Sequence, residues 1–348
     1  MKRRILIIKP SSMGDVVHAF PAVHALMQDP DQTIDWVINP AFSELLDYLP
    51  GIGRKILFRR RELGKITSFF PTAFELLREL RSKPYDAVID LQGLFRSALV
   101  GLSAGSKLRY GPAAAREPLA RLCYNRKLHY PENIRHAVEK NCAMIGEFSG
   151  QENISPDYRL PELEKYAVTA DGLLTENGLV GSRFLATAPG ARWKTKQWPP
   201  EFFADCIEKT AEKLAEVAFV LLGSPAEQPL CRKIMGMTRK AKVVDLSGKT
   251  TPGTLTEIIR RAELLLCNDS GPMHLAAAVG TPVTALFGPT DPELTGPYGK
   301  NCRILQPELN CIKCFHKNCP TEECHLKISP ETAVSAIMEQ LRKGVERK

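Results

Sequence analysis

The sequence predicts an α/β protein built from two doubly wound domains that face a central cleft. Short apolar runs rich in β-branched residues, such as residues 5–8, alternate with helical segments along the chain, as in parallel sheets. The alternation is interrupted over the polar, turn-rich residues 150–161 and then starts again. A length of 348 residues also exceeds one ordinary domain. Together these observations indicate two Rossmann-like domains in tandem.

The expected elements follow from apolar periodicity. In the first half, strands are expected at 5–8, 34–38, 55–58, 87–89 and 107–110, and helices at 16–26, 41–49, 72–81, 95–102 and 134–148. In the second half, strands are expected at 184–188, 217–222, 243–246, 264–267 and 283–287, and helices at 163–176, 201–214, 226–235, 255–262, 274–279 and 330–342. We therefore expect domains at 1–160 and 161–325, with residues 326–348 forming a terminal helix that crosses back to the first domain.

Composition and charge narrow the class of protein. The chain is 44% hydrophobic and 25% charged, and no apolar run reaches the ~20 residues that cross a bilayer. The apolar segment after the basic start stops at Lys9, which is too short for a signal peptide, so we expect a cytoplasmic protein. A net charge of +8 favours an anionic partner. The sparse aromatic residues are not interleaved with the cations, which argues against nucleic acid.

The loop after the first strand is the first candidate site. Ser11, Ser12, Gly14 and Asp15 lie between a buried strand and a helix, where open α/β sheets bind ligands. Gly14 permits a tight turn, the serines offer hydroxyls, and the carboxylate of Asp15 could accept a proton. An aspartate just before a helix is also a good N-cap, so this residue type alone leaves both readings open. The loop matches neither a Walker A motif nor a dinucleotide fingerprint.

Two basic groups interrupt the first half. The first comprises Arg59, Arg60 and Arg61 with Lys65 nearby, and the second comprises Arg116, Arg121, Arg126 and Lys127. Such runs are often only solvated surface. The alternative is a rim that binds phosphate or carboxylate groups, because arginine binds both bidentately.

The second half carries a loop typical of an anion site. After a strand, Asp269, Ser270 and Gly271 lead into a helix with Pro272 near its first position. The free N–H groups and positive dipole end of that helix suit a diphosphate, while Asp269 and Ser270 could bind sugar hydroxyls. His274 could belong to this site or to the core.

Three further loops complete the candidate site. Residues 189–199 carry Arg192, Lys194 and Lys196 between a strand and a helix. Fixed cations of this kind can neutralise a leaving diphosphate, and no Asp-x-Asp pair in a suitable loop suggests a metal instead. Glu227 follows another strand and could hold ribose hydroxyls. A glycine-proline turn at 288–292 follows the last predicted strand.

Half of the ten cysteines gather near the C-terminus. Four of them have a dense spacing, namely Cys311, Cys314, Cys319 and Cys324, with His316 and His325 beside them. This is not a standard zinc-finger spacing, so two interpretations remain, packed thiols and a structural metal site. A disulfide is a third, although it forms less readily in the cytoplasm. We assign no metal to the reaction.

These motifs resemble the ADP-heptose:lipopolysaccharide heptosyltransferases, a family of inverting glycosyltransferases with two Rossmann-like lobes (GT-B fold). The similarity spans essentially the whole chain. Residues 9–16, 90–94, 115–119 and 124–127 are similar to heptosyltransferase I in particular. Residues 269–275 and 288–292 are similar across the family.

The resemblance implies transfer of L-glycero-D-manno-heptose from ADP-heptose to the Kdo residues of lipid A. This reaction takes place at the cytoplasmic face of the inner membrane, where the enzyme would be peripheral. No cofactor is implied, and nucleic acid is not an expected partner. The first domain would bind the acceptor and the second the nucleotide sugar.

The resemblance also assigns residues, with Asp15 as the base that deprotonates the acceptor hydroxyl. The implied donor-binding residues are Lys196 for the diphosphate, Glu227 for the ribose, Asp269 for the heptose, and Ser270, Gly271, Met273 and His274 in the donor loop. The implied acceptor-binding residues are Ser11, Ser12, Gly14, Arg60, Arg61, Lys65, Gln92, Arg116 and Arg126.

Two departures bear on specificity. Ala191 and Arg192 stand where heptosyltransferase I usually has hydroxyl residues, and the cysteine-rich segment is more similar to heptosyltransferase II. A heptosyltransferase II-like enzyme, or a transferase for another core sugar, is therefore the alternative. A two-lobed sugar-nucleotide epimerase and a non-catalytic protein that binds lipopolysaccharide or nucleic acid through its basic face are the rivals from other classes.

Overall fold

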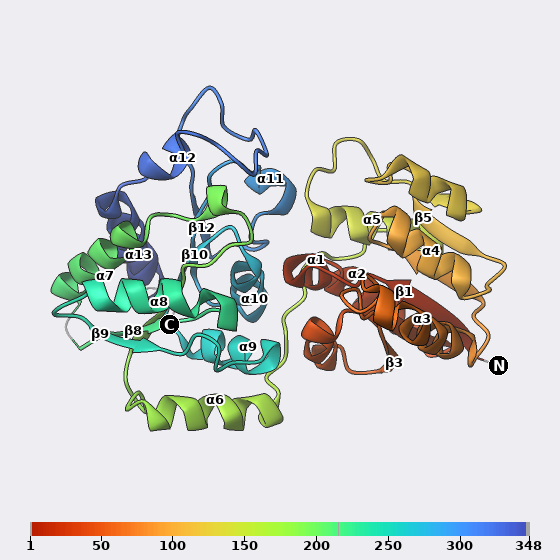
Figure 1. Ribbon diagram of the computed structural model, residues 1–348, viewed down its shortest axis with the longest axis horizontal. Coiled ribbons are helices and arrows are strands. Elements are labelled where there is room, and N and C mark those ends of the chain that lie inside the picture. The colour runs from red at the N-terminus through yellow and green to blue at the C-terminus, as the bar shows by residue number, and fades with distance from the viewer. Residues whose placement is uncertain (1, 215, 346–348) are drawn as a thin grey trace. The chain divides into compact units, whose positions relative to one another are not determined.

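The protein is described by a computed structural model, which covers residues 2–214 and 216–345. The chain divides into two compact units, Met1–Tyr158 and Arg159–Lys348. Each unit contains a six-stranded sheet with helices packed on it (Figure 1). Every strand pairing in both sheets is parallel, as the βα alternation predicted.

The first sheet is doubly wound around its first strand. Its strands are β1 (Arg3–Ile8), β2 (Gln32–Ile38), β3 (Ile52–Leu57), β4 (Ala87–Asp90), β5 (Arg109–Pro112) and β6 (Arg126–Leu128). They are ordered β3-β2-β1-β4-β5-β6, so the winding reverses between β1 and β4. Ile8 lies beside Asp90 in the register, which places the loops after these two strands next to each other. Such a switch point is where doubly wound sheets bind ligands.

The second sheet repeats this topology. Its strands are β7 (Phe184–Ala188), β8 (Ala218–Leu221), β9 (Lys242–Asp245), β10 (Leu265–Asn268), β11 (Val283–Leu286) and β12 (Cys302–Leu305). The order is β12-β11-β10-β7-β8-β9, with the reversal between β7 and β10. The predicted class of two Rossmann-like domains is thus confirmed.

Helices connect the strands and cover both sheets. In the first unit they are α1 (Met13–His18), α2 (Phe20–Met27), η1 (Pro40–Tyr48), α3 (Ile66–Arg81), α4 (Phe95–Ser103), η2 (Pro118–Cys123) and α5 (Ala137–Ser149), where η denotes a 3-10 helix. In the second unit they are α6 (Glu164–Glu176), η3 (Lys194–Lys196), α7 (Pro200–Lys213), η4 (Pro225–Glu227), α8 (Gln228–Met237), α9 (Pro252–Arg261), α10 (Gly271–Val279), α11 (Pro292–Thr295), α12 (Glu323–Leu326) and α13 (Pro330–Val345).

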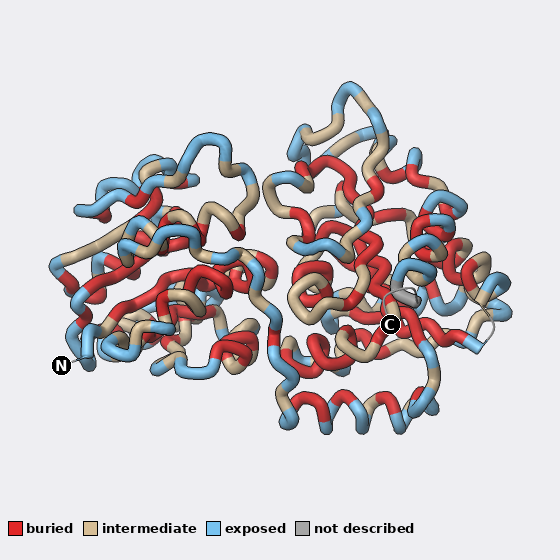
Figure 2. The backbone as a smooth tube through the Cα atoms, turned by 180° about the vertical axis from the view of Figure 1, so that it is seen from behind, coloured by how far each residue is buried: buried red, intermediate tan, exposed pale blue. Residues whose placement is uncertain are grey.

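The central strands of both sheets are buried along their length, and Figure 2 shows buried stretches through the interior of each unit. The four residues Ile5–Ile8 are wholly inaccessible, as expected for a strand covered on both faces. In the second unit, Trp198 and Phe203 pack edge to face in a core that also contains Ile337 of α13. The two sheets therefore hold the loops at their carboxyl ends on rigid supports.

Several predicted elements differ from those observed. The helix expected at 16–26 is two helices that meet at Ala19, because Pro21 has no N–H to continue the first helix. The segment 41–49 is the 3-10 helix η1. The short edge strands β6 and β12 were missed, since three or four residues carry little periodic signal.

The C-terminal helix packs on the core of the second unit. Val334 and Ile337 of α13 are buried there with residues of α7 and β11. This packing covers the apolar stripe of the helix, because burial against the nearby sheet removes its hydrophobic surface from water.

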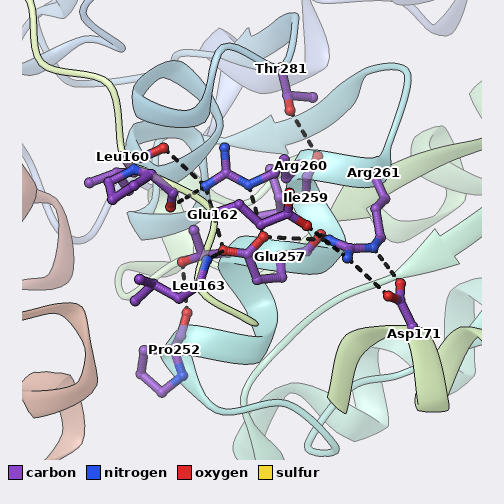
Figure 3. A network of polar contacts seen from close by, with 12 residues as sticks. Leu160, Glu162, Leu163, Asp171, Pro252, Glu257, Ile259, Arg260, Arg261 and Thr281 are labelled. Carbon is purple, nitrogen blue, oxygen red and sulfur yellow. Dashed lines mark hydrogen bonds and ion pairs between the residues drawn. The ribbon is translucent and has the colours of Figure 1, made fainter. Parts of the chain in front are cut away.

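A polar network fixes the beginning of the second unit (Figure 3). Glu257 of α9 is fully buried and pairs with Arg260 at 2.8 Å and with Arg261 at 3.4 Å. Arg260 also donates to the carbonyls of Leu160 and Pro161, and Arg261 pairs with Asp171 of α6. Buried charge is tolerated when it is paired and hydrogen-bonded in this way. The network anchors α6 and the chain before it to α9.

Candidate functional site

Asp15 lies at the start of α1, at the carboxyl end of β1. The structure corrects its expected capping position: Ser12 is the N-cap, and Asp15 is the third helical residue. Its Oδ2 accepts hydrogen bonds from the Ser12 backbone N–H and from Ser12 Oγ, both at 2.8 Å. This is the reciprocal arrangement of a capping box. The half-buried carboxylate is therefore oriented by its own turn.

Two buried charges lie under this loop. Lys9 is 8% exposed and donates to the Leu91 carbonyl at 2.6 Å. Burial lowers the pKa of Lys9, and the nearby carboxylates of Asp15 and Asp90 oppose that shift. Burial raises the pKa of Asp90, although the hydroxyls of Tyr124 and Ser97 donate to its carboxyl group at 2.7 and 2.8 Å. The loops after β1 and β4 thus share one electrostatic environment.

Gln92 and Arg116 are brought to the same edge of the sheet. The Gln92 backbone N–H donates to Asp90 at 2.8 Å, while its buried side-chain Oε1 has no hydrogen-bond partner in the described chain. Glu117 N–H donates to the Gly93 carbonyl at 3.1 Å, which ties the next loop to this one. Arg116 is exposed and close enough to depress the pKa of Lys9. An unpaired acceptor can accept a hydrogen bond from a ligand hydroxyl, and an exposed arginine can bind an anionic group.

The other cations predicted for the first unit lie further from Asp15. Arg60, Arg61 and Lys65 follow β3, two strands to one side of β1, and all three are exposed. Arg126 begins the edge strand β6, three strands to the other side, or about 14 Å at ordinary strand spacing. The predicted acceptor residues therefore span the sheet edge, and only some of them are adjacent to Asp15.

In the second unit, the loops after β7, β10 and β11 meet at one ion pair. Lys196 Nζ lies 2.6 Å from Asp269 Oδ2, with side chains 17% and 7% exposed. Thr290 Oγ1 donates to the same carboxylate oxygen at 2.6 Å. Trp193 places its ring 4.7 Å from Lys196 Nζ, a cation–π contact. A lysine and a carboxylate held this way present one cation and one acceptor at the carboxyl edge of the sheet.

Asn268 and Ser270 fix the loop that carries Asp269. Fully buried Asn268 accepts from Trp198 N–H at 3.1 Å and donates to the Pro189 carbonyl at 2.7 Å. Ser270 is the N-cap of α10, and its buried Oγ has no hydrogen-bond partner within residues 2–214 and 216–345. N–H groups at a helix start and an unpartnered hydroxyl are groups that can bind an anion.

Glu227 reaches the same edge from the loop after β8. Its Oε2 accepts from the Ser224 backbone N–H at 2.6 Å and from Ser224 Oγ at 2.8 Å. A Cβ atom at Gly190 would lie 1.9 Å from Glu227 Oε1, so the Glu227 side chain occupies the space that a side chain at position 190 would need. The structure thus brings together Lys196, Asp269, Ser270 and Glu227 in the second unit.

Comparison with known proteins identifies the family. The model of glycosyltransferase family 9 (heptosyltransferase) matches residues 73–325. The chain belongs to this family. Lipopolysaccharide heptosyltransferase 1 of Pseudomonas aeruginosa is 31% identical over 337 residues, which cover 92% of this chain and 89% of that protein. The predicted family and the prediction of a glycosyltransferase are confirmed.

Two further relatives are similar to the chain over nearly its whole length. Lipooligosaccharide heptosyltransferase 2 of Haemophilus influenzae is 29% identical over 353 residues, covering 97% of this chain and 99% of that one. The structure of Escherichia coli heptosyltransferase WaaC with ADP is 27% identical, has a TM-score of 0.77, and covers 97% of this chain and 99% of that chain. The same enzyme is solved with ADP-2-deoxy-2-fluoro heptose.

Two residues predicted in the donor loop of this heptosyltransferase are buried. The Met273 side chain is wholly inaccessible, so it packs in the core, and only its backbone is available near the loop. His274 is 7% exposed on the first turn of α10. The sequence pattern could not show which residues after Gly271 face the loop and which face the core. The helix begins at Gly271, and side chains of its first turns already face the sheet.

The cysteine-rich segment of the heptosyltransferase docks on the loops after β7 and β11. Phe315 N–H donates to the Pro289 carbonyl at 2.8 Å, and Thr195 Oγ1 donates to the His316 carbonyl at 2.9 Å. Lys313 pairs with Asp291 at 3.0 Å. Within the described residues, all ten cysteines are free thiols and no group of three or more His, Cys, Asp or Glu is placed to hold a metal ion.

Thr290 was not assigned from the sequence, and His325 was considered only as a neighbour of the cysteine-rich segment. His325 is 2% exposed, and neither ring nitrogen has a hydrogen-bond partner in the described part of the chain. Burial lowers the pKa of His325 to about 4, although the Thr195 backbone and Asp269 oppose the shift. For Thr290 the signal was present, because it lies in the glycine-proline turn that was singled out, but the turn alone did not show which side chain faces Asp269.

A surface hollow of about 680 Å³ lies elsewhere in the second unit. It is lined by Arg183, Pro282 and Asn301, which directly precede β7, β11 and β12. It therefore opens at the amino ends of the strands, whereas ligands of doubly wound sheets bind at the carboxyl ends. Its lining contains none of the residues that surround Lys196.

Within the described residues, no helix is long and apolar enough to span a membrane.

Proposed function

We propose that the chain is an inverting lipopolysaccharide heptosyltransferase that moves L-glycero-D-manno-heptose from ADP-heptose to Kdo-lipid A. Family membership and the names of the relatives support the reaction class. The ion pair of Lys196 and Asp269 carries the proposal. It places a cation that can bind a diphosphate beside a carboxylate that can accept hydrogen bonds from sugar hydroxyls, at the carboxyl edge of a doubly wound sheet.

The donor roles follow from the charge of each group. Lys196 and the N–H groups at the start of α10 neutralise the charge that develops on the departing diphosphate. Asp269 accepts hydrogen bonds from the heptose, and Glu227 accepts them from the ribose. Ser270 Oγ, which is unpaired in the described chain, donates to a phosphate oxygen. These fixed groups supply the charge stabilisation that a metal ion would otherwise provide, so no cofactor is needed.

The acceptor roles belong to the first unit. Asp15 takes the proton of the acceptor hydroxyl as that oxygen attacks the anomeric carbon, and ADP leaves from the opposite face. Ser12 orients the carboxylate of Asp15. Gln92 and Arg116 bind the acceptor near this base, and Arg60, Arg61, Lys65 and Arg126 bind its outer anionic groups. The enzyme works at the cytoplasmic face of the inner membrane, where its lipid acceptor resides.

A heptosyltransferase II-like acceptor is the alternative. Relatives named heptosyltransferase 1 and heptosyltransferase 2 are almost equally identical to this chain. Incubation with ADP-heptose and either Kdo-lipid A or Kdo-lipid A that already carries one heptose separates the two. Mass spectrometry should show one added heptose on the first acceptor only. Addition to the second acceptor alone would establish the alternative.

Donor controls test the remaining rival. ADP-heptose should support turnover, whereas UDP- and GDP-sugars should not. With ADP-heptose and no acceptor, a transferase leaves the donor nearly intact, while an epimerase converts it to an isomer that NMR detects. Isomerisation without acceptor would refute the proposed reaction.

A further inference from the structure

The first unit exposes large apolar side chains on only three of its helices. Within the described residues of this unit, every exposed large hydrophobic side chain lies on α3, α4 or η2. They are Ile66, Phe69, Phe70 and Phe74 of α3, Phe95, Leu99 and Leu102 of α4, and Leu119 and Leu122 of η2. Single exposed apolar residues are ordinary, but a concentration of them marks an interaction surface.

These three helices cover one face of the sheet. Leu80 of α3 and Val100 of α4 pack on the same core cluster, which includes Leu6 and Ile8 of β1. Ala98 of α4 packs with Ala120 of η2 in the adjoining cluster, and Arg81 at the end of α3 donates to the carbonyl of Ser103 at the end of α4. The inner sides of the helices are thus used by the fold, and the apolar side chains on their outer sides are exposed.

The most exposed stripe is on α3. Ile66, Phe70 and Phe74 are 94%, 77% and 69% exposed. They are spaced four residues apart, so they lie one above another along one side of the helix. Leu76 and Leu80, further along the helix, face the core instead. The outward stripe therefore has no structural role within this unit.

Cations surround the apolar layer. Residues 59–81, 95–103 and 116–123 contain nine Lys or Arg and four Glu. Arg59 is paired with Glu75 at 2.7 Å, but Arg96 and Arg121, which have no role in the proposed acceptor site, are exposed and have no ion-pair partner in the described chain. A partner that covers this face must therefore accept apolar side chains and supply negative charge.

We propose that this face, formed by the outer sides of α3, α4 and η2, docks on the surface of an anionic lipid bilayer. Phenylalanine, leucine and isoleucine side chains would enter the boundary between head groups and acyl chains, and the cations would bind lipid phosphates. This inference rests on the proposed function in one respect, namely that the acceptor is a lipid. It adds which helices contact the bilayer.

The charge of the face favours a bilayer over a second copy of the chain. Symmetric self-association would set the same cationic surface against itself, and like charges brought together oppose binding. A bilayer that contains anionic lipid offers an opposite and continuous charge. Self-association is accordingly the competing outcome in the test.

The test uses the full chain and vesicles that contain no lipopolysaccharide. Co-sedimentation is measured with vesicles of phosphatidylglycerol and phosphatidylcholine, and with phosphatidylcholine alone. We expect binding to the anionic vesicles, weakened by high salt. The triple variant Ile66→Ser, Phe70→Ser, Phe74→Ser should bind about tenfold less. A matched variant of the second unit, Val168→Ser with Val180→Ser, replaces side chains of similar exposure (65% and 69%) and should bind as the native chain does.

Two readouts keep the proposal separate from the heptosyltransferase reaction. Turnover on a deacylated, water-soluble acceptor should be the same for the triple variant and the native chain, which also shows that the variant is folded. Failure of all heptosyl transfer alongside intact vesicle binding would count against the proposed function alone. Equal vesicle binding by the native chain and the triple variant, or loss of a dimer in the triple variant without any vesicle binding, would overturn the docking proposal.

Discussion

At the scale of single residues, Lys196 interacts with both a carboxylate of the protein and, in the proposed reaction, a phosphate of the donor. It pairs with Asp269 at 2.6 Å, and in the proposed reaction it also binds the donor diphosphate. Thr290 donates to the same Asp269 oxygen, so the carboxylate keeps a donor when Lys196 turns to the ligand.

Replacing Lys196 by alanine should weaken donor binding and also slow the chemical step, because its charge acts on the diphosphate both in the bound donor and as the diphosphate departs. A hydrogen bond to a charged group contributes about 1.5–3 kcal/mol, so the Kd for ADP should rise about ten- to a hundredfold in calorimetry. Lys194→Ala is the matched control, because Lys194 lies in the same short helix with its side chain 82% exposed. An unchanged Kd for the Lys196 variant would remove this lysine from the donor site.

Thr290→Val removes one hydroxyl and keeps the shape of the side chain. It should leave Asp269 with one donor fewer and raise the KM for ADP-heptose severalfold, with a smaller effect on kcat. Steady-state kinetics measure both values. A variant with native KM would indicate that Thr290 only packs in the turn.

His325 predicts a pH dependence of stability. Its folded pKa of about 4 lies below the ordinary value of 6.5, so the unfolded chain binds a proton more readily. Between pH 6.5 and 4 the free energy of unfolding should therefore fall by up to about 3 kcal/mol from this residue, and above pH 6.5 it should contribute no slope. Urea titrations of the native chain and of His325→Gln measure this. The slope should shrink in the variant.

At the scale of elements, the α1–α2 break and α13 illustrate what periodicity can and cannot predict. The apolar spacing identified α13, but it could not specify which sheet the helix would cover. Pro21 was visible in the sequence, yet only the geometry shows two short helices meeting at Ala19. The short strands β6 and β12 gave too little signal, because their place is set by pairing with a neighbour.

The site was predictable where a motif coincided with the end of a strand. Asp15, Lys196 and Asp269 lie on such loops, and strand order makes the last two neighbours. Met273 was placed in the donor loop, although its side chain is in the core, because a helix start does not reveal which residue turns inward. The docking of the cysteine-rich segment depends on contacts more than a hundred residues apart in the chain, such as Thr195 with His316, which no local pattern encodes.

Ile337 tests the assignment of α13 to the second core. Its side chain is 1% exposed among residues of that core, so Ile337→Ala should lower the free energy of unfolding by about 2–5 kcal/mol. Ser335→Ala, on the exposed side of the same helix, should change it little. Urea denaturation compares the two, and equal stabilities would contradict the packing described here.

At the scale of the whole molecule, the chain uses one topology twice. Both sheets place their switch point beside the first strand of the unit, and both collect polar side chains in the loops that follow. The first unit gathers a carboxylate and cations, whereas the second gathers an ion pair and a helix N-terminus. This division of residue types matches the two substrates of a glycosyl transfer, a nucleophile that must lose a proton and a leaving group whose developing negative charge must be stabilised.

Removal of divalent cations tests whether the cationic groups of the protein are enough to stabilise the departing diphosphate without a metal ion. Because Lys196 and the start of α10 supply the charge stabilisation, turnover should be unchanged in excess EDTA. Loss of activity with EDTA, and its recovery with added magnesium, would show that the diphosphate needs a metal ion as well.

The direct test of the account is Asp15→Asn, assayed with ADP-heptose and Kdo-lipid A. The amide keeps the size of the side chain and an oxygen for Ser12, but it cannot take the acceptor proton. We predict that kcat falls by about 10²–10⁴ while the Kd for ADP stays native, with the exposed control Asp31→Asn fully active. Native turnover by Asp15→Asn would contradict the proposed mechanism.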